Sequence, residues 1–250
     1  MSKIKFGLKL WSVDRVLLNQ AEELIERKIF DYVELLVVPK TEITPFFNCK
    51  LPYIIHIVHD AFGLNISDQQ KRKSNLEMIK ESFVWAKNLK AKHLILHPGF
   101  GKIEDAEEFL KEVKGKNILI ENMPKVGLNG EKMIGFSPQQ MKVLQDKRFG
   151  FCLDVGHAIG SAISQKIDYK KYLKNFLSLK PKVLHICDGN LDSEIDQHLN
   201  LGSGQFDWQF IAEEIIPKVP LITLETPRNN LKSLDEDVVN IRFLREFLNK

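Results

Sequence analysis

The feature that most constrains the fold of this chain is a regular alternation of short apolar runs and amphipathic segments. The apolar runs predict strands at 4–10, 30–38, 53–59, 93–97, 117–121, 149–154, 182–187 and 221–225. Apolar residues at helical spacing predict helices at 15–27, 67–89, 104–113 and 138–144, then in the stretch ending near 179, and at 207–216 and 235–247.

Eight strand–helix units without an internal linker are the number that a (β/α)8 TIM barrel contains. We therefore predict an α/β protein with one TIM barrel domain over residues 1–250. An open doubly wound sheet would normally have fewer units, and its first strand would lead into a glycine-rich phosphate turn. No such turn follows the first predicted strand here.

The composition excludes several classes of protein. With 44% hydrophobic and 28% charged residues the chain is typical of a soluble globular protein. No apolar run approaches the roughly 20 residues that a membrane span needs, and residues 1–5 lead into a strand without a signal-peptide pattern. We expect a cytoplasmic protein with no membrane partner. The net charge of +3 permits a phosphorylated or nucleic-acid partner without favouring one.

The three cysteines, Cys49, Cys152 and Cys187, are too scattered to indicate a disulfide framework or a thiolate zinc site. Cys152 and Cys187 lie in apolar runs, which is typical of small core residues.

Polar side chains recur where the predicted strands end. These are His59, His97, Glu121, Asp154 with His157, His185 and Glu225, and the loop after the seventh strand adds Asp196 and His198. In a barrel the carboxyl ends of all strands meet at one rim, where barrel active sites are built. The side-chain alternation of a strand agrees, because each of the following pairs shares a face: Leu119 and Glu121, Cys152 and Asp154, Val183 and His185, Thr223 and Glu225.

Histidine, aspartate and glutamate at one rim are the ligand set of zinc, manganese and similar divalent ions. Buried carboxylates need a counter-charge, and these motifs contain no Arg or Lys, so we expect a divalent metal. Single residues have plainer interpretations: His56 and His93 are typical of core or bottom-rim positions, and His59 could be structural or reach a substrate. An acid at a strand end is often a helix cap. Aromatic residues that could line a pocket are Trp11, Phe62, Phe100 and Trp208.

Several motifs resemble the xylose-isomerase-like TIM barrel superfamily, also called AP endonuclease family 2. They are FGLKLWS at 6–12, ILIEN at 118–122, LDVGHA at 153–158, HICDGN at 185–190 and DQHLNLGSGQFDW at 196–208. The superfamily contains sugar and sugar-phosphate isomerases and epimerases, and also nucleases of the endonuclease IV type. The resemblance covers essentially the whole chain.

Resemblance to the isomerase branch implies one divalent ion, Mn, Zn, Mg or Co, held by Glu121, Asp154, His185 and Glu225. It also implies that His157 contacts substrate hydroxyls and that Glu121 and Glu225 transfer protons. An ion that bridges the oxygens of an α-hydroxy carbonyl acidifies the C–H between them, so that a carboxylate can remove the proton and an enediolate forms. Isomerases of free ketoses often have an Arg soon after the strand-seven histidine, and none follows His185 here.

Resemblance to the nuclease branch implies a three-zinc cluster. Eight of its nine ligand types are present, namely His97, Glu121, Asp154, His157, His185, Asp196, His198 and Glu225. The ninth, a histidine after the third strand, would fall near Ser67, where there is none. The set of His157, Asp196 and His198 is complete, so a second or third metal is compatible with either branch.

Features outside the metal ligands favour a small-molecule substrate. An abasic-site nuclease should carry basic and apolar residues on its rim loops, but the predicted loops are short, and their basic residues are Lys40, Lys102, Lys125, Lys132 and Arg228. The primary hypothesis is a metal-dependent isomerase or epimerase of a sugar or sugar phosphate, with His97, Asp196 and His198 as substrate contacts or ligands of a further metal. The alternatives are a multi-zinc phosphodiesterase that binds nucleic acid and a barrel that only binds ligands. A homo-oligomer is compatible with either enzyme.

Overall fold

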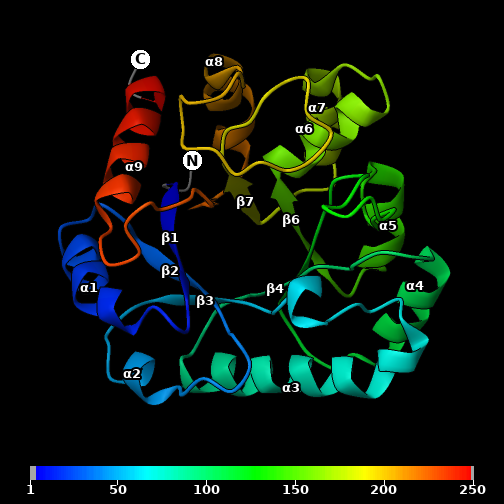
Figure 1. The fold of residues 1–250 in the computed structure, drawn as a ribbon, viewed down its shortest axis with the longest axis horizontal. Helices are drawn as coiled ribbons and strands as arrows, with labels where there is room; N and C mark the ends of the chain where they lie inside the picture. The colour runs from blue at the N-terminus through cyan, green and yellow to red at the C-terminus, as the bar shows by residue number, and fades with distance from the viewer. Residues whose placement is uncertain (1–3, 249–250) are drawn as a thin grey trace.

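A computed structural model of the protein describes residues 4–248 and shows a closed barrel of eight parallel strands in sequence order (Figure 1). Each strand pairs with its neighbours in the chain, and β8 closes the barrel on β1 with Leu8 opposite Leu224. The predicted (β/α)8 fold class is confirmed. The predicted domain span includes residues 1–3 and 249–250, which lie outside the described residues.

The strands are short and lie within or close to the predicted runs. They are β1 (Lys5–Trp11), β2 (Tyr32–Leu36), β3 (Tyr53–His56), β4 (Leu94–Leu96), β5 (Ile118–Glu121), β6 (Gly150–Asp154), β7 (Val183–Ile186) and β8 (Leu221–Leu224). The third predicted run extends beyond its strand, so His59 lies in the following loop as the N-cap of η2 (Asp60–Phe62).

The helices form a ring around the strands (Figure 1). They are α1 (Leu18–Glu26), α2 (Thr44–Phe47), α3 (Arg72–Asn88), α4 (Ile103–Glu112), α5 (Pro138–Gln145), α6 (Val155–Ser164), α7 (Tyr169–Leu177), α8 (Trp208–Phe210) and α9 (Asp235–Leu248). Short 3-10 turns are η1 (Arg15–Leu17), η3 (Gln69–Lys71) and η5 (Ile216–Lys218), and η4 (Ile211–Ile215) is a π-helical turn. The helix predicted at 207–216 is therefore a mixture of α-, π- and 3-10-helical turns. No helix within residues 4–248 is long and apolar enough to cross a membrane.

The inside of the barrel is filled at one level by an apolar layer. Its members are Tyr32, Ile54, Ile95, Leu119, Cys152 and Val183, with Leu221 packed against them. Strand β1 contributes Gly7 at this level, because a Cβ there would lie 2.3 Å from the Tyr32 ring. The missing side chain on β1 therefore makes room for the large ring on β2.

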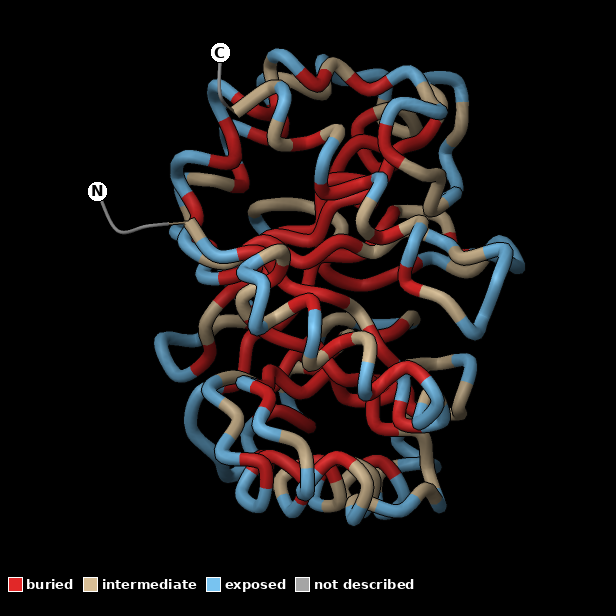
Figure 2. Tube along the Cα trace, turned by 90° about the vertical axis from the view of Figure 1, so that its left-hand side faces the viewer, coloured by how far each residue is buried: buried red, intermediate tan, exposed pale blue. Residues whose placement is uncertain are grey.

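The other face of the strands packs against the helices. Phe151 and Leu153 belong to this outer core, and the Phe151 ring stacks on Phe176 of α7 with centroids 5.9 Å apart. Buried residues follow the strands and the inward sides of the helices, whereas exposed residues lie on the outer turns (Figure 2). Strands buried on both faces hold the rim side chains on a rigid support.

Candidate metal centre

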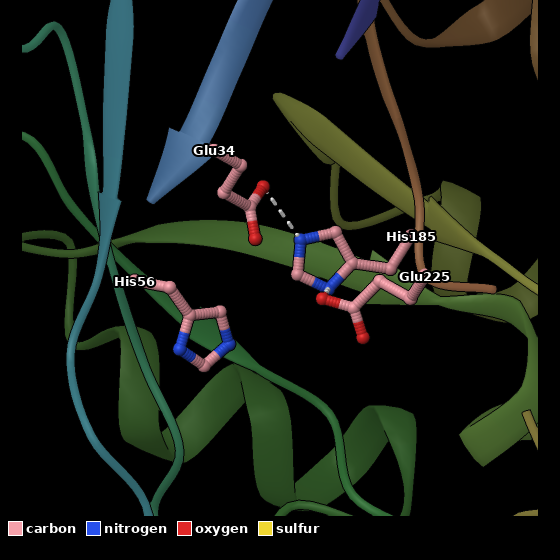
Figure 3. Close-up of side chains that lie close together, drawn as sticks. All are labelled: Glu34, His56, His185 and Glu225. Carbon is pink, nitrogen blue, oxygen red and sulfur yellow. Dashed lines mark hydrogen bonds and ion pairs between the residues drawn. The ribbon is translucent and has the colours of Figure 1, made fainter. Parts of the chain in front are cut away.

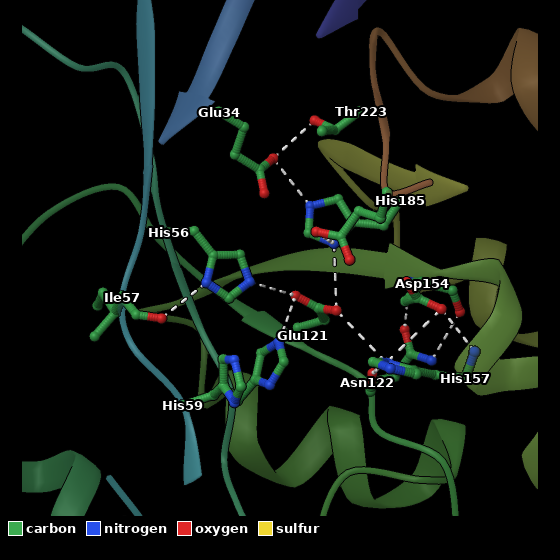
Figure 4. A network of polar contacts seen from close by, with 12 residues as sticks. Glu34, His56, Ile57, His59, Glu121, Asn122, Asp154, His157, His185 and Thr223 are labelled. Carbon is green, nitrogen blue, oxygen red and sulfur yellow. Dashed lines mark hydrogen bonds and ion pairs between the residues drawn. The ribbon is translucent and has the colours of Figure 1, made fainter. Parts of the chain in front are cut away.

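A polar layer lies two residues further along each strand than the apolar layer. Because side chains alternate along a strand, these residues also face the barrel interior. In strand order the layer consists of Lys9, Glu34, His56, His97, Glu121, Asp154, His185 and Thr223. Contacts among Glu34, His56, Glu121, His185 and Thr223 can be followed in Figure 4, and Lys9 and His97 join them through Glu34 and Glu121. Asp154 is connected to this network through His157, which lies beside Glu121.

Glu121, at the end of β5, lies between four imidazoles. Its Oε2 atom is 3.4 Å from His56 Nε2 and 3.1 Å from His97 Nε2, and its Oε1 atom is 3.5 Å from His157 Nδ1 and 3.3 Å from His185 Nδ1. Neither carboxylate oxygen has a hydrogen-bond donor, although the side chain is fully buried. A buried carboxylate without a hydrogen-bond donor is stabilised by a nearby positive charge, so Glu121 is a candidate metal ligand.

Asp154, at the end of β6, is the N-cap of α6. Its Oδ1 atom accepts a hydrogen bond of 2.6 Å from the backbone N–H of His157, while its Oδ2 atom is buried without a partner. Burial raises the pKa of Asp154 to about 7, and the nearby carboxylates of Asp196 and Glu121 act in the same direction. The cap thus fixes one oxygen and leaves the other available to a cation.

His185 on β7 is oriented by Glu34 of β2. Its Nε2–H donates to Glu34 Oε2 at 3.0 Å, and the same oxygen accepts the Thr223 hydroxyl at 2.7 Å. This bond leaves Nδ1 facing Glu121 Oε1 at 3.3 Å and Glu225 Oε1 at 3.2 Å. A carboxylate behind a histidine is the usual arrangement that orients a metal ligand.

Lys9 of β1 forms ion pairs with Glu34, at 2.7 Å, and with Glu225. Burial alone would lower the pKa of Lys9, but the surrounding carboxylates outweigh it and raise the pKa above its ordinary value. Burial would raise the pKa of Glu225, but the charges of His185 and Lys9 hold it at about 2. The structure therefore supplies a lysine counter-charge that the strand-end motifs did not reveal.

His157, Asp196 and His198 form a second set of close contacts. His157 Nε2 lies 3.2 Å from Asp196 Oδ2, and His198 Nε2 contacts the same oxygen. The opposite nitrogen of each ring donates to a backbone carbonyl, His157 Nδ1 to Asn122 at 2.8 Å and His198 Nδ1 to Glu225 at 2.7 Å. Burial would lower the pKa of His198, but Asp196 raises it to about 10.

Five sets of side chains among the described residues have one potential ligand atom each within 4.8 Å of one another, and we name three of them here by one member each. The Asp154 cluster is Glu121, Asp154, His185 and Glu225; the His198 cluster is His157, Asp196 and His198; the His97 cluster is His56, His97 and Glu121. All eight metal-ligand candidates of the sequence analysis fall in these three clusters.

The donors in these clusters fit a divalent ion. Several of their atoms are buried without a hydrogen-bond partner, namely both Glu121 carboxylate oxygens, Asp154 Oδ2, His185 Nδ1, Asp196 Oδ1 and both ring nitrogens of His97. Imidazole and carboxylate donors are those that zinc and manganese take. The residues present are thus compatible with the metal chemistry of either branch.

Sequence reasoning missed part of the site. His56, expected to be a core residue, faces Glu121, and Glu34 and Lys9 lie within strands rather than at their ends. No histidine lies at Ser67, where the nuclease branch would have one, but the His59 ring stacks on that of His97 with centroids 5.5 Å apart. The spacing of two residues from the apolar layer could have identified Lys9, Glu34 and His56.

A cavity of about 400 Å³ opens above the clusters. His56, His59, His97, His157, Asp196, His198 and Glu225 lie on its polar side, and Trp11, Met123, Val126, Leu128, Met133 and Ile195 are among its apolar lining residues. Lys9 is the one Lys or Arg among the described residues that line it. Four aromatic residues were candidates to line a pocket. Of these, Trp11 lines the cavity, and Phe62 packs against Trp11 with ring centroids 5.9 Å apart. Trp208 instead donates its indole N–H to Asp188.

Comparison with known proteins identifies related sequences. The model of the xylose isomerase-like TIM barrel family matches residues 41–247. An uncharacterized protein of Methanocaldococcus jannaschii is 26% identical over 257 residues, covering 92% of this chain and 93% of that protein. A probable endonuclease 4 of Mycoplasmopsis synoviae is 28% identical over 218 residues, covering 78% of this chain and 77% of that protein.

Solved structures with the same fold include proteins of both branches. A D-tagatose 3-epimerase-like protein superposes with a TM-score of 0.75 at 19% identity, covering 98% of this chain and 97% of that one. Endonuclease IV from Thermus thermophilus superposes with a TM-score of 0.74 at 20% identity, covering 98% of this chain and 99% of that one. The two scores are nearly equal, so the fold does not distinguish the branches.

Proposed function

The chain belongs to the xylose isomerase-like TIM barrel family, and from that premise we propose that it is a divalent-metal-dependent isomerase or epimerase of a sugar or sugar phosphate. The observation that supports this proposal is the cavity that Glu225 of the Asp154 cluster lines together with His157. Its volume of about 400 Å³ is at the small end of the range of about 300–1,000 Å³ for small-molecule sites. Its lining holds one lysine and no arginine among the described residues, whereas binding to a DNA backbone requires several cationic contacts.

The side chains around the Asp154 cluster match the needs of proton transfer. Glu121 and Glu225 both approach His185 Nδ1, at 3.3 and 3.2 Å, so both carboxylates lie beside the same ligand position. Burial would raise the pKa of Glu225, but the charges of His185 and Lys9 outweigh it, lower the pKa and keep Glu225 ionised, which is the form that can accept a proton. His157 lines the cavity and can bind a substrate hydroxyl through Nε2, because its Nδ1 is held by the Asn122 carbonyl.

A divalent ion in the Asp154 cluster would polarise two adjacent substrate oxygens and acidify the C–H bond between them. Glu225 would remove that proton. In an isomerisation, Glu121 or Glu225 would return a proton to the neighbouring carbon; in an epimerisation, one of them would return it to the opposite face of the same carbon. The apolar side chains of Trp11, Leu128 and Ile195 line the cavity in which the substrate would bind.

Hydrogen exchange with solvent tests this proposal across many sugars. The metal-loaded protein is incubated in D₂O with a panel of pentoses, hexoses and their phosphates, and deuterium at carbon is measured by mass spectrometry. We expect incorporation next to the carbonyl of at least one sugar, and a loss of about 10²–10⁴-fold in Glu225→Gln. Glu42→Gln, an exposed glutamate paired with Arg15, is the matched control and should keep full exchange. Absence of exchange with every metal and sugar would contradict the proposal.

A second candidate is a multi-zinc phosphodiesterase of the endonuclease IV type. The adjoining clusters favour it, because Glu121 is shared between the Asp154 and His97 clusters, the His198 cluster is complete, and His59 stacks beside His97. The name of the Mycoplasmopsis synoviae relative points the same way. In such an enzyme the metals would activate water and hold the leaving oxygen.

Two measurements distinguish the candidates. Elemental analysis of freshly purified protein should give about one divalent ion per chain for the isomerase and about three zinc ions for the nuclease. Incubation of the zinc-loaded protein with a duplex that contains one abasic site should leave the strand intact if the isomerase proposal holds. Nicking that disappears in Asp196→Asn would establish the nuclease instead.

A further inference from the structure

A fourth set of ligand-type side chains lies beside the Asp154 cluster. Glu34, His56, His185 and Glu225 also have one potential ligand atom each within 4.8 Å of one another (Figure 3). We name them the Glu34 cluster. Glu34 and His185 are fully buried, and the Glu225 side chain is 10% exposed. The composition alone, two carboxylates and two imidazoles, would suit a divalent ion.

The Lys9 ammonium already contacts both carboxylates of this cluster. Its Nζ lies 2.7 Å from Glu34 Oε1 and is also paired with Glu225 Oε1. Lys9 comes from β1, and its side chain is only 13% exposed. The Lys9 ammonium therefore lies between the two carboxylates, at the position that a metal ion would occupy.

The Glu34 and Asp154 clusters share His185 and Glu225, so a cation in one affects the ligands of the other. The hydrogen bond from His185 Nε2 to Glu34 keeps a proton on Nε2 and leaves the Nδ1 lone pair for the Asp154 cluster. A metal ion bound to His185 Nε2 in the Glu34 cluster would displace this proton, and Glu34 would then bind the ion instead of accepting the hydrogen bond.

We propose that Lys9 is a built-in cation that occupies the Glu34 cluster and excludes a divalent ion from it, which leaves His185 and Glu225 to the metal of the Asp154 cluster. Lys9 is therefore a positioning residue rather than a metal ligand. The proposal concerns where the metal binds and holds for either candidate reaction.

The charge of Lys9 can be removed with little change in side-chain length. In Lys9→Met, Glu34 and Glu225 lose their counter-charge, and a divalent ion becomes the cation that can replace it. Lys9→Arg keeps the charge. The double variant Lys9→Met with Glu34→Gln removes one of the two carboxylates that would hold the additional ion.

The experiment measures zinc per chain by elemental analysis after equilibrium dialysis. We expect Lys9→Met to bind one more zinc ion than wild type. Lys9→Arg and the double variant should bind the same number as wild type when the dialysis zinc is high enough to fill an Asp154 cluster weakened by Glu34→Gln. In crystals of zinc-loaded Lys9→Met, an anomalous peak should lie within about 2.0–2.2 Å of a Glu34 oxygen. A folded Lys9→Met with the wild-type zinc count would overturn the proposal.

If Lys9→Met does not fold without metal, refolding with and without zinc replaces the dialysis. The proposal predicts that zinc restores the far-ultraviolet circular dichroism of this variant, because the ion replaces the ammonium. Failure of zinc to restore the fold, together with a folded Lys9→Arg, would show that Lys9 has a packing role and would also overturn the proposal.

Discussion

At the scale of single residues, four histidines of the site are each oriented by a hydrogen bond from one ring nitrogen. His56, His157 and His198 each use Nδ1 to donate to a backbone carbonyl, and His185 uses Nε2 to donate to Glu34. The remaining nitrogen of each ring faces a carboxylate. Such bonds fix both the tautomer and the direction of the free lone pair, and they are typical of metal-bound histidines.

We predict that Glu34→Gln weakens metal binding at the Asp154 cluster by about 10–100-fold, because the neutral amide holds the His185 proton less firmly. The dissociation constant, measured by competition with a chromophoric chelator, checks this. Glu42→Gln is the control, since the Glu42 side chain is exposed and its ion pair is with Arg15, away from the clusters. An unchanged constant in Glu34→Gln would mean that Glu34 does not orient His185.

The protonation of His198 makes metal binding depend on pH. Its pKa of about 10 means that the metal-free protein holds a proton on His198 at neutral pH, and a metal ligand must lose that proton. We therefore predict that zinc binding at the His198 cluster releases a proton and that affinity rises as pH increases from about 6 toward 9. Calorimetry in buffers of different ionisation enthalpy measures the released protons. Affinity that falls over this range would contradict the assignment.

At the scale of elements, the position of a residue in its strand decided whether the sequence could predict it as part of the site. Glu121, Asp154 and His185 stand at or near strand ends, so the predicted strand boundaries brought them to the rim. Glu34 lies inside β2, where all five residues are buried, and the run has no alternation that shows which way Glu34 faces. When a strand is buried on both faces, its sequence does not show which side chains point into the barrel, and only the closed barrel shows this.

The two faces of a strand should separate stability from metal binding. Phe151 points away from the site and stacks on Phe176, whereas Asp154 on the same strand faces inward. We predict that Phe151→Ala lowers the free energy of unfolding by about 3–5 kcal/mol, as is usual for a buried phenylalanine. Urea unfolding of the metal-free protein measures this.

Zinc affinity of the folded Phe151→Ala protein should stay within about twofold of wild type, because the lost ring lies on the outer face. The control is Phe47→Ala, on the exposed end of α2, which should change neither quantity. A large loss of zinc affinity with little change in stability would mean that the outer face also shapes the site.

At the scale of the whole molecule, the barrel concentrates charge around its axis. Six of the seven histidines gather there, His93 being the exception, with five carboxylates from Glu34, Glu121, Asp154, Asp196 and Glu225. Lys9 balances one of these charges. Burial would lower the pKa values of His157 and His185, but neighbouring acidic groups raise both well above the ordinary value: Asp154 and Asp196 act on His157, and Cys152, Glu225 and Glu34 act on His185. In the metal-free chain, protons on histidine thus provide the balance that metal ions would otherwise provide.

Metal removal should therefore cost global stability. A ligand at about 100 times its dissociation constant stabilises the native state by about 2.7 kcal/mol per site, which corresponds to a rise in Tm of roughly 5–10 °C for a chain of this size. We predict that chelation lowers Tm by at least this amount, and that the difference between loaded and chelated protein is larger at about pH 8 than at about pH 6, because protons compete for the same imidazoles. Differential scanning calorimetry measures this difference in Tm between loaded and chelated protein. In Asp154→Asn the difference should be smaller by about the contribution of one metal site. Equal Tm values for loaded and chelated wild type would mean that the carboxylates around the axis are balanced by protons and Lys9 alone.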